Sequence, residues 1–300
     1  MAGRVDAVVV GGGPAGISAA HWLARYRRRT TLIDGGEPRN RWTEAIHGYL
    51  GSEAASPGEL VERSRTDLKP YPEVDVRQGS VLDVEAETDG FVLSLEGEEI
   101  AARAVVLATG VVDVFPEVRG FETHYGASVF HCPACDGYEA RGHRAVVFGW
   151  GPQITGFAET LLTWARSVTV VTNGPDLEVD RAERSRLEEL GIAVLEEPAE
   201  ELIGARGDLR GVRLAGGEFV PCEIGFFTIG HRPRSDLARR LGCRVTPEDL
   251  IAVDENGGTT VPGVWAAGDI TPGPQLVQIA AAEGTAAGIA CATWLRSRSA

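Results

Sequence analysis

The stretch VDAVVVGGGPAGISAAHWLARY, residues 5–26, decides the fold of this 300-residue chain. Its β-branched beginning, Val5–Val10, is typical of a strand that is covered on both faces. From Ile17 to Tyr26 the apolar residues recur at helical spacing, which predicts a helix. The glycines between the two let the backbone approach a pyrophosphate, and the helix N-terminus supplies free N–H groups to hold it. The stretch therefore predicts a dinucleotide-binding turn.

A second predicted strand, Thr30–Ile33, strengthens this interpretation because it ends at an acidic residue. Asp34 stands 18 positions after Gly16, where a carboxylate accepts hydrogen bonds from ribose hydroxyls. A strand, a glycine turn, a helix, a strand and an acidic residue in this order form a βαβ unit, which is far more specific than the glycines alone. The cofactor contacts predicted in this unit are Gly11, Gly13, Pro14, Ala15, Gly16 and Asp34.

A second βαβ unit is expected about 140 residues further along the chain. It combines a strand at Ala145–Phe148, a turn at 149–151, a helix at Phe157–Trp164 and a strand at Val168–Val171. Near the C-terminus a strand at Val264–Ala266 precedes a helix from Gln278 to Leu295. Strands that alternate with helices predict an α/β fold with parallel sheets. We therefore expect two Rossmann-like dinucleotide-binding domains.

Composition narrows the function classes. The chain has 43% hydrophobic residues, enough for sizeable cores, and a formal net charge of −14 with a sequence pI of about 4.9. Such an acidic balance argues against a nucleic-acid partner, which would require clustered Lys and Arg. No apolar run reaches the roughly 18–20 residues that span a bilayer. Because five cysteines is an odd number without a signal sequence, we expect a protein of the reducing cytoplasm.

The chemistry-bearing motif is Cys132-Pro133-Ala134-Cys135, followed at once by Asp136. Two cysteines at this spacing can close a small disulfide ring, which stores two electrons reversibly. A metal site is the alternative, but no second cysteine pair or histidine stands at zinc-ligand spacing, so we expect no metal. Asp136 is a candidate proton donor or acceptor for the thiols. Its other interpretation is a helix N-terminal carboxylate that is stabilised by the dipole.

Over nearly its whole length the chain resembles the low-molecular-weight thioredoxin reductases. The resemblance rests on the order and spacing of several motifs: Gly11–Gly16, Ala108-Thr109-Gly110, Cys132–Gly137, Pro262-Gly263-Val264, Ala267-Gly268-Asp269 and Gln278. It implies an FAD-binding domain at residues 1–117 and 245–300, with an NAD(P)-type domain that carries the CxxC inserted at residues 118–244. It also implies a homodimer with thioredoxin or another dithiol as its substrate.

The same resemblance assigns further site residues. It implies that Cys135 faces the flavin and that Cys132 attacks the external disulfide. It puts Asp269 near the ribityl chain and His47 in a loop along the flavin. His47 would tune the flavin or shuttle a proton there, or would be a structural residue of the turn. The remaining cofactor contacts implied are Ala108, Thr109, Gly110, Gly268, Gln278 and Ile279.

The second glycine-rich turn departs from the family pattern. Trp150 puts an indole in the turn, and Ile154 stands where a small residue is needed for close packing of the helix. The arginine pair that would clamp a 2′-phosphate is replaced by Thr172-Asn173-Gly174. A basic residue before Gln278 is replaced by Val277. We therefore expect that NADPH is not the usual electron donor.

Three functions follow from these residues. The first is a disulfide reductase that receives electrons from reduced ferredoxin, flavodoxin or NADH. The second is a dithiol oxidase that works in the opposite direction, with oxygen as the electron acceptor. Family relatives of that kind often carry His directly after the CxxC, so Asp136 favours the reductase. The third is a flavin-bearing redox sensor without turnover.

Overall fold

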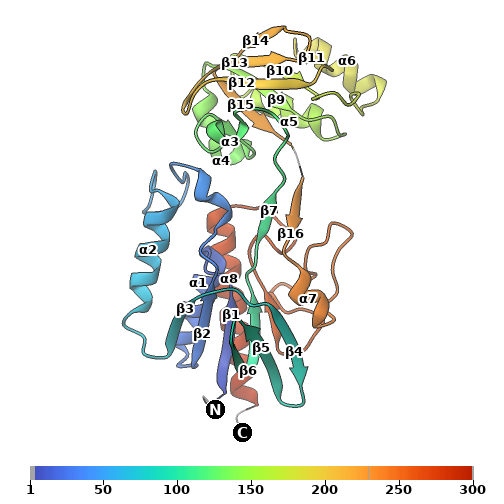
Figure 1. Ribbon diagram of the computed structural model, residues 1–300. Coiled ribbons are helices and arrows are strands. Elements are labelled where there is room, and N and C mark those ends of the chain that lie inside the picture. Colours follow the sequence, from blue (N-terminus) through green and yellow to red (C-terminus); the bar gives the residue numbers. More distant parts are fainter. Residues whose placement is uncertain (1–3, 229, 299–300) are drawn as a thin grey trace. The chain divides into compact units, whose positions relative to one another are not determined.

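The protein is described here by a computed structural model, which covers residues 4–228 and 230–298 (Figure 1). The chain divides into two compact units. Unit 1 comprises Met1–Arg41, Pro57–Val112 and Arg232–Ala300, and unit 2 comprises Trp42–Ser56 and Asp113–His231. The chain passes between the units through β7 (Val111–Asp113) and β16 (His231–Pro233), which pair with each other as a small sheet.

Unit 1 is built on a mixed sheet with the order β3-β2-β1-β6-β5-β4, in which β17 also pairs with β6. Parallel pairing joins β1 to β2 and β6, β2 to β3, and β17 to β6, whereas β4, β5 and β6 pair antiparallel. The strands are β1 (Val5–Val10), β2 (Thr30–Asp34), β3 (Val74–Gln78), β4 (Asp83–Glu87), β5 (Gly90–Leu95), β6 (Glu98–Leu107) and β17 (Val264–Ala266).

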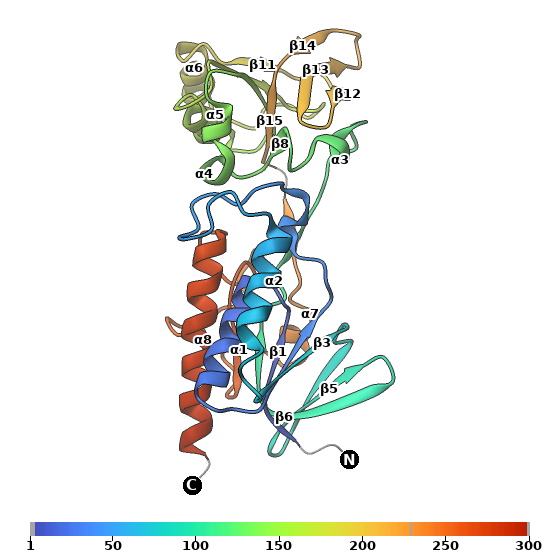
Figure 2. The ribbon, with the colours of Figure 1, turned by 90° about the vertical axis from the view of Figure 1, so that its left-hand side faces the viewer.

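The helices of unit 1 cover this sheet on different sides. They are α1 (Pro14–Arg25), η1 (Arg39–Trp42, whose last residue falls in unit 2), α2 (Pro57–Leu68), α7 (Asp236–Arg240) and α8 (Val277–Ser297). Alternate residues of β1 separate the two cores: Val9 packs with α1 and α8, whereas Val8 packs with the β4–β5 hairpin and α7. Figure 2 shows α1 and α8 side by side along the sheet.

Small residues bring α1 and α8 close together. A Cβ atom at Gly284 would lie 2.0 Å from the carbonyl oxygen of Ala15, and one at Gly288 would lie 2.7 Å from that of Ala19. The backbones of the two helices therefore touch without intervening side chains. Because the glycine turn precedes α1, this contact fixes the position of the turn against the C-terminal helix.

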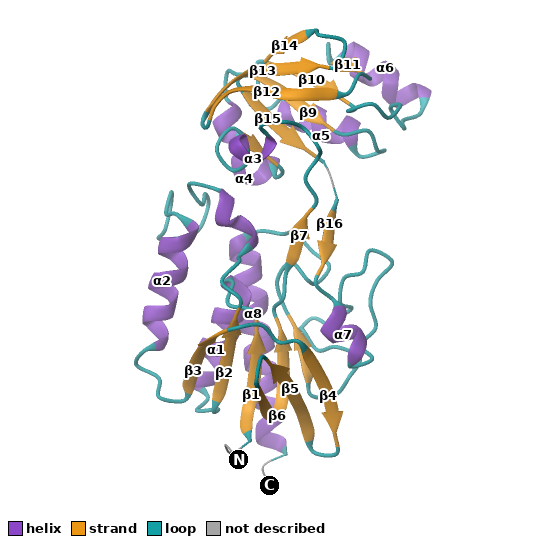
Figure 3. Cartoon of the chain, viewed as in Figure 1, coloured by secondary structure: helices purple, strands orange, loops and turns teal. Residues whose placement is uncertain are grey.

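Unit 2 has a parallel sheet with the order β11-β10-β9-β15-β8, sandwiched between two layers. Helices α5 and α6 share one core with this sheet, and the antiparallel sheet β12-β13-β14 shares the other core with α3 (Figure 3). The strands are β8 (Val129–Phe130), β9 (Arg144–Phe148), β10 (Ser167–Val171), β11 (Ala193–Leu195), β12 (Ala199–Ala205), β13 (Asp208–Leu214), β14 (Phe219–Pro221) and β15 (Ile224–Phe227). The helices are α3 (Phe121–His124), α4 (Pro133–Asp136), η2 (Tyr138–Ala140), α5 (Ile154–Leu161) and α6 (Arg181–Glu189).

The predicted α/β class is confirmed, and the two compact units differ from the predicted domain boundaries in two segments. The sequence analysis assigned residues up to 244 to the inserted domain, but α7 belongs to unit 1. Its Leu237 and the following Leu241 are buried in the same core as Val8. Conversely, the segment Trp42–Ser56 groups with unit 2, where Trp42, Glu44 and His47 have interaction partners.

Candidate functional site

The first glycine turn is shaped by contacts that leave no room for side chains. A Cβ atom at Gly11, whose φ is +111°, would lie 2.2 Å from the carbonyl oxygen of Ala108, and one at Gly16 would lie 1.8 Å from that of Gly11. At Gly12 it would meet Asp34 Cγ at 2.3 Å. Gly13 differs, because no atom lies within 4 Å of its ideal Cβ position. The turn is therefore tightly packed at Gly11, Gly12 and Gly16 and open at Gly13.

Helix α1 begins beside this opening in a form suited to an anion. Pro14 occupies its first turn, Ala15 and Gly16 are buried, and Gly13 caps it without a side-chain hydrogen bond. The first turn holds no acidic side chain. Free N–H groups at the start of a twelve-residue helix favour a phosphate. These residues therefore fit the pyrophosphate of a dinucleotide.

Asp34 ends β2 next to the glycine turn and is buried. One carboxylate oxygen accepts from the backbone N–H of Gly36 at 3.0 Å, and the other pairs with Arg65 of α2. Arg65 was not predicted as a site residue, because nothing in its local sequence indicates a partner 31 positions away. A ribose at Asp34 would share this carboxylate with the guanidinium group.

The loop after β6 also lies at the glycine turn. The N–H of Ala108 donates to Val10 O at 2.8 Å, and Thr109 Oγ1 donates to Arg234 O at 2.8 Å. Gly110 has a φ of +65°, a conformation that glycine adopts without strain. The structure thus brings these three predicted residues to the same edge of the sheet as Gly11.

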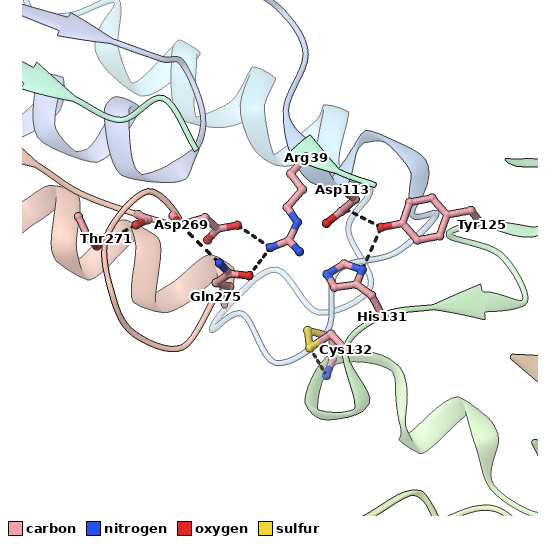
Figure 4. Close-up of polar contacts among 10 residues, drawn as sticks. Arg39, Asp113, Tyr125, His131, Cys132, Asp269, Thr271 and Gln275 are labelled. Carbon is pink, nitrogen blue, oxygen red and sulfur yellow. Dashed lines mark hydrogen bonds and ion pairs between the residues drawn. A yellow bond between two sulfur atoms is a disulfide. The ribbon is translucent and has the colours of Figure 1, made fainter. Parts of the chain in front are cut away.

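The turn after β17 carries the C-terminal residues of the predicted cofactor site. The N–H of Gly268 donates to Glu283 Oε2 at 2.8 Å, and Thr271 Oγ1 lies 3.0 Å from the same oxygen. Arg39 Nη1 lies 3.1 Å from Asp269 Oδ2 and 2.6 Å from Gln275 Oε1 (Figure 4). The sequence analysis did not predict Arg39 and Gln275 as neighbours of Asp269.

Gln278 and Ile279 lie in the first turn of α8, which begins at Val277, and both are half-buried. This turn follows the loop that holds Asp269. The structure therefore gathers most of the predicted cofactor residues in unit 1. His47 is the exception, since it lies in the segment that groups with unit 2.

The CxxC motif forms a disulfide at the start of α4. Cys132 and Cys135 are joined, with their Cα atoms 5.2 Å apart. Cys132 caps the helix, and its sulfur accepts a hydrogen bond from the N–H of Cys135 at 3.1 Å. Pro133 fills the first helical position, where its missing N–H costs nothing. Proline and the cap therefore explain why a helix of four residues begins here.

Asp136 is the last residue of this helix and is half-buried. Removal of its carboxyl group from water raises its pKa to about 7, and the negative charge of Glu139 acts in the same direction. His47 acts in the opposite direction. A group with this pKa takes up and releases protons at neutral pH.

A hydrogen-bonded chain reaches the residue before Cys132. Tyr125 is buried, and its hydroxyl donates to Asp113 Oδ2 at 2.8 Å (Figure 4). His131 Nδ1 lies 2.9 Å from the same hydroxyl oxygen. Asp113 and Tyr125 were not predicted, because the chain brings them to His131 only through the fold of unit 2. They fix the imidazole next to the disulfide.

The second glycine turn, after β9, is packed differently from the first. Ile154 is fully buried, and its Cδ1 atom would lie 2.9 Å from a Cβ atom at Gly149. After β10, the side-chain oxygen of Asn173 accepts a hydrogen bond from the N–H of Ala199 at 2.8 Å. Residues 172–180 contain three acidic side chains and no Lys or Arg. This segment therefore lacks a cation for a 2′-phosphate.

The other cysteines are buried and unpaired. Burial raises the pKa of the thiols of Cys222, Cys243 and Cys291, which agrees with inert core residues. Among residues 4–228 and 230–298, no three or more His, Cys, Asp or Glu side chains are placed to hold a metal ion. In the same part of the chain, no helix combines the length and apolar character that crossing a bilayer requires.

Comparisons with known proteins agree with these features. A family model described as pyridine nucleotide-disulphide oxidoreductase matches residues 5–284. The thioredoxin reductase of Mycolicibacterium smegmatis is 32% identical over 306 residues, which covers 97% of this chain and 96% of the relative.

Two solved structures extend the likeness to the whole fold. The structure of HlmI is 34% identical with a TM-score of 0.92, and the alignment covers 99% of this chain and 94% of that one. A putative thioredoxin reductase, TrxB from Bacillus anthracis, is 27% identical with a TM-score of 0.93, covering 99% and 100%. The predicted architecture of two dinucleotide-binding domains is thereby confirmed.

Proposed function

The chain belongs to the pyridine nucleotide-disulphide oxidoreductase family, and on this premise we propose that it exchanges electrons between FAD and Cys132–Cys135, and then with an external disulfide. It is a thioredoxin reductase-like flavoprotein oxidoreductase. The observation that carries the proposal is the disulfide at the start of α4 with Asp136 at the end of the same helix. Thioredoxin, the substrate that the relatives' names indicate, is the proposed partner.

The residues of unit 1 are proposed to hold the flavin. The open side of Gly13 and the start of α1 would take the pyrophosphate, and Asp34 a ribose. The loops at Ala108 and Asp269 would line the remainder of the cofactor, with α8 beside them. When bound, the flavin supplies a two-electron store that can exchange with a dithiol.

The thiol chemistry is assigned to unit 2. A thiolate of the pair attacks the external disulfide, and the sulfur that leaves takes up a proton. Asp136 is proposed to give that proton, and its pKa of about 7 keeps a protonated fraction at neutral pH. Cys132 is the proposed attacking residue, because the N–H of Cys135 favours negative charge on its sulfur.

The proposed electron donor is not NADPH. Residues 172–180 after β10 include no Lys or Arg that could bind a 2′-phosphate, and the side-chain oxygen of Asn173 already accepts a hydrogen bond from Ala199. Reduced ferredoxin, a flavodoxin or NADH is proposed in its place, because none of these requires a 2′-phosphate clamp.

A dithiol oxidase is kept as a second candidate because of the pKa of Asp136. At about 7, the carboxylate accepts a proton from an external thiol as readily as the acid donates one. The residue therefore suits both directions of exchange. In the oxidase direction the electrons would leave through the flavin to oxygen.

A comparison of donors tests the proposal. The purified flavoprotein is made anaerobic and treated with stoichiometric NADPH, NADH, reduced ferredoxin or a small dithiol, while the flavin absorbance is followed. We expect rapid bleaching with the dithiol and with ferredoxin or NADH, and none with NADPH. Rapid bleaching by NADPH would refute the proposed donor class.

Release of hydrogen peroxide with a dithiol in air would instead favour the oxidase. Light scattering checks the proposed homodimer.

A further inference from the structure

The segment 42–56 is joined to the rest of unit 2 at its start, and a bridge within the segment closes its remainder into a loop. At its start, Arg206 Nη2 donates to Trp42 O at 2.9 Å. Further on, Ile46 pairs with Ala55 in an isolated antiparallel bridge, and the N–H of Ile46 donates to Ala55 O at 2.8 Å. The residues between this pair therefore form a short loop with a fixed base.

His47 is the first residue of that loop, and Glu53 holds it in place. Glu53 Oε1 lies 2.8 Å from His47 Nδ1, and Glu53 Oε2 accepts from the N–H of Gly48 at 2.8 Å. The other ring nitrogen, Nε2, lies 3.5 Å from Glu139 Oε1. The imidazole thus bridges a carboxylate of its own loop and a carboxylate of η2. The His47 side chain is 28% exposed, so it also contacts solvent.

Glu139 connects this bridge to the CxxC motif. It follows Asp136 by three residues, and Gly137 between them keeps helical backbone angles. The charges that act on Asp136 are those of Glu139 and His47. The charges that act on His47 are those of Glu53, Glu139 and Asp136, and its pKa is raised, chiefly by the hydrogen bond to Glu53. His47 therefore contacts both Glu53 and Glu139, and the charges of His47 and Glu139 act on Asp136.

We propose that His47, held by Glu53 and paired with Glu139, is a positioning residue that relays protons between Asp136 and solvent during dithiol–disulfide exchange. Asp136 is half-buried and must gain or lose one proton for each thiol with which it exchanges a proton. His47 is partly exposed, and both of its ring nitrogens face carboxylates. This inference rests on the proposed function and adds a route for its protons.

The proton balance of the relay is the same in both directions. When a thiolate of the pair attacks an external disulfide, one S–S bond forms, one breaks, and the departing sulfur takes the proton of Asp136. The carboxylate regains a proton from water through His47. When an external dithiol reduces the Cys132–Cys135 disulfide and is itself oxidised to a disulfide, the proton of the attacking thiol passes to the carboxylate of Asp136 and leaves by the same route. The relay itself gains and loses no electrons.

Infrared titration of the purified protein tests the coupling directly. The C=O stretch of protonated Asp136 is isolated by subtracting the spectrum of Asp136→Asn, and its loss is followed as pH rises. His47→Gln removes a cation, so we expect the loss to move to higher pH. Glu139→Gln removes an anion, so we expect it to move to lower pH. His143→Gln, in the same unit, is the matched control and should leave the titration unchanged.

Chemical rescue tests the relay. His47→Ala should slow turnover, and added imidazole should restore it, whereas a purely structural loss would not respond. Titrations of His47→Gln and Glu139→Gln that superimpose on the parent, or an absence of imidazole rescue, would overturn the inference. Retained turnover in Cys132→Ser would instead refute the proposed function, so the two failures are distinguishable.

Discussion

The backbone N–H of Cys135 donates a hydrogen bond of 3.1 Å to the sulfur of Cys132. Cys132 caps α4, so its sulfur lies where the first N–H groups of the helix point. Such a position favours negative charge on sulfur. The two cysteines are therefore not equivalent, although the sequence motif treats them alike.

This asymmetry predicts the order in which the two thiols react. In the reduced protein, iodoacetamide should modify Cys132 several-fold faster than Cys135, because the thiolate is the reactive form. Mass spectrometry of peptides at short times measures the ratio. Cys222, which is buried and whose pKa is raised, serves as an internal control that stays unmodified. Faster modification of Cys135 would contradict the assignment of Cys132 as the attacking residue.

Two glycines of the first turn are predicted to respond differently to alanine. Gly16→Ala puts a methyl group 1.8 Å from a backbone oxygen, so we expect a loss of stability of several kcal/mol and little folded protein. Gly13→Ala meets no atom within 4 Å, so it should fold normally. Because its methyl group would occupy the space proposed for the pyrophosphate, its flavin content should fall.

Circular dichroism and the ratio of flavin to protein absorbance separate these outcomes. Gly58→Ala is the matched control, since its added Cβ also meets open space but lies in α2, away from the turn. We expect it to keep both fold and flavin. A Gly13→Ala protein with full flavin content would contradict the proposed position of the cofactor.

Asp136 makes stability depend on pH. Its native pKa of about 7 exceeds the ordinary value of 3.8, so the folded state binds this proton more tightly than the unfolded state. The stabilisation is complete below pH 3.8 and is lost as pH rises through 7. Asp136→Asn should therefore raise Tm at pH 8 and change Tm little near pH 4. The corresponding gain in the free energy of unfolding at pH 8 is at most about 4 kcal/mol. Equal changes in Tm at pH 4 and pH 8 would contradict the destabilisation by a half-buried Asp136 carboxylate.

The local patterns of the sequence predicted much of unit 1. Val5–Val10 and the helix that ends at Arg25 were expected because strand and helix periodicities are local. The glycine turn was predictable for the same reason, because closely spaced glycines between a strand and a helix are a local pattern. The disulfide was expected from its spacing, and a helix at Asp136 was one of the two interpretations of that residue.

Contacts between distant segments were not predictable. The sheet β12-β13-β14 was missed because its strands mix charged and apolar residues without a clear alternation. The segment 42–56 joins unit 2 through partners such as Arg206, which stands 164 positions from Trp42. For the same reason, Glu53 and Glu139 did not emerge as partners of His47. Spacing and sequence adjacency identify the reactive pair and Asp136, but the partners of His47 depend on tertiary packing.

Anaerobic titration of the flavoprotein with a small dithiol tests the central claim most directly. In the parent protein, we expect one equivalent beyond that needed to open the Cys132–Cys135 disulfide to bleach the flavin absorbance. In Cys132→Ser and Cys135→Ser, each with its flavin bound, the same additions should leave the flavin oxidised. Equally fast bleaching in either variant would show that electrons reach the flavin without the pair, and would contradict the account.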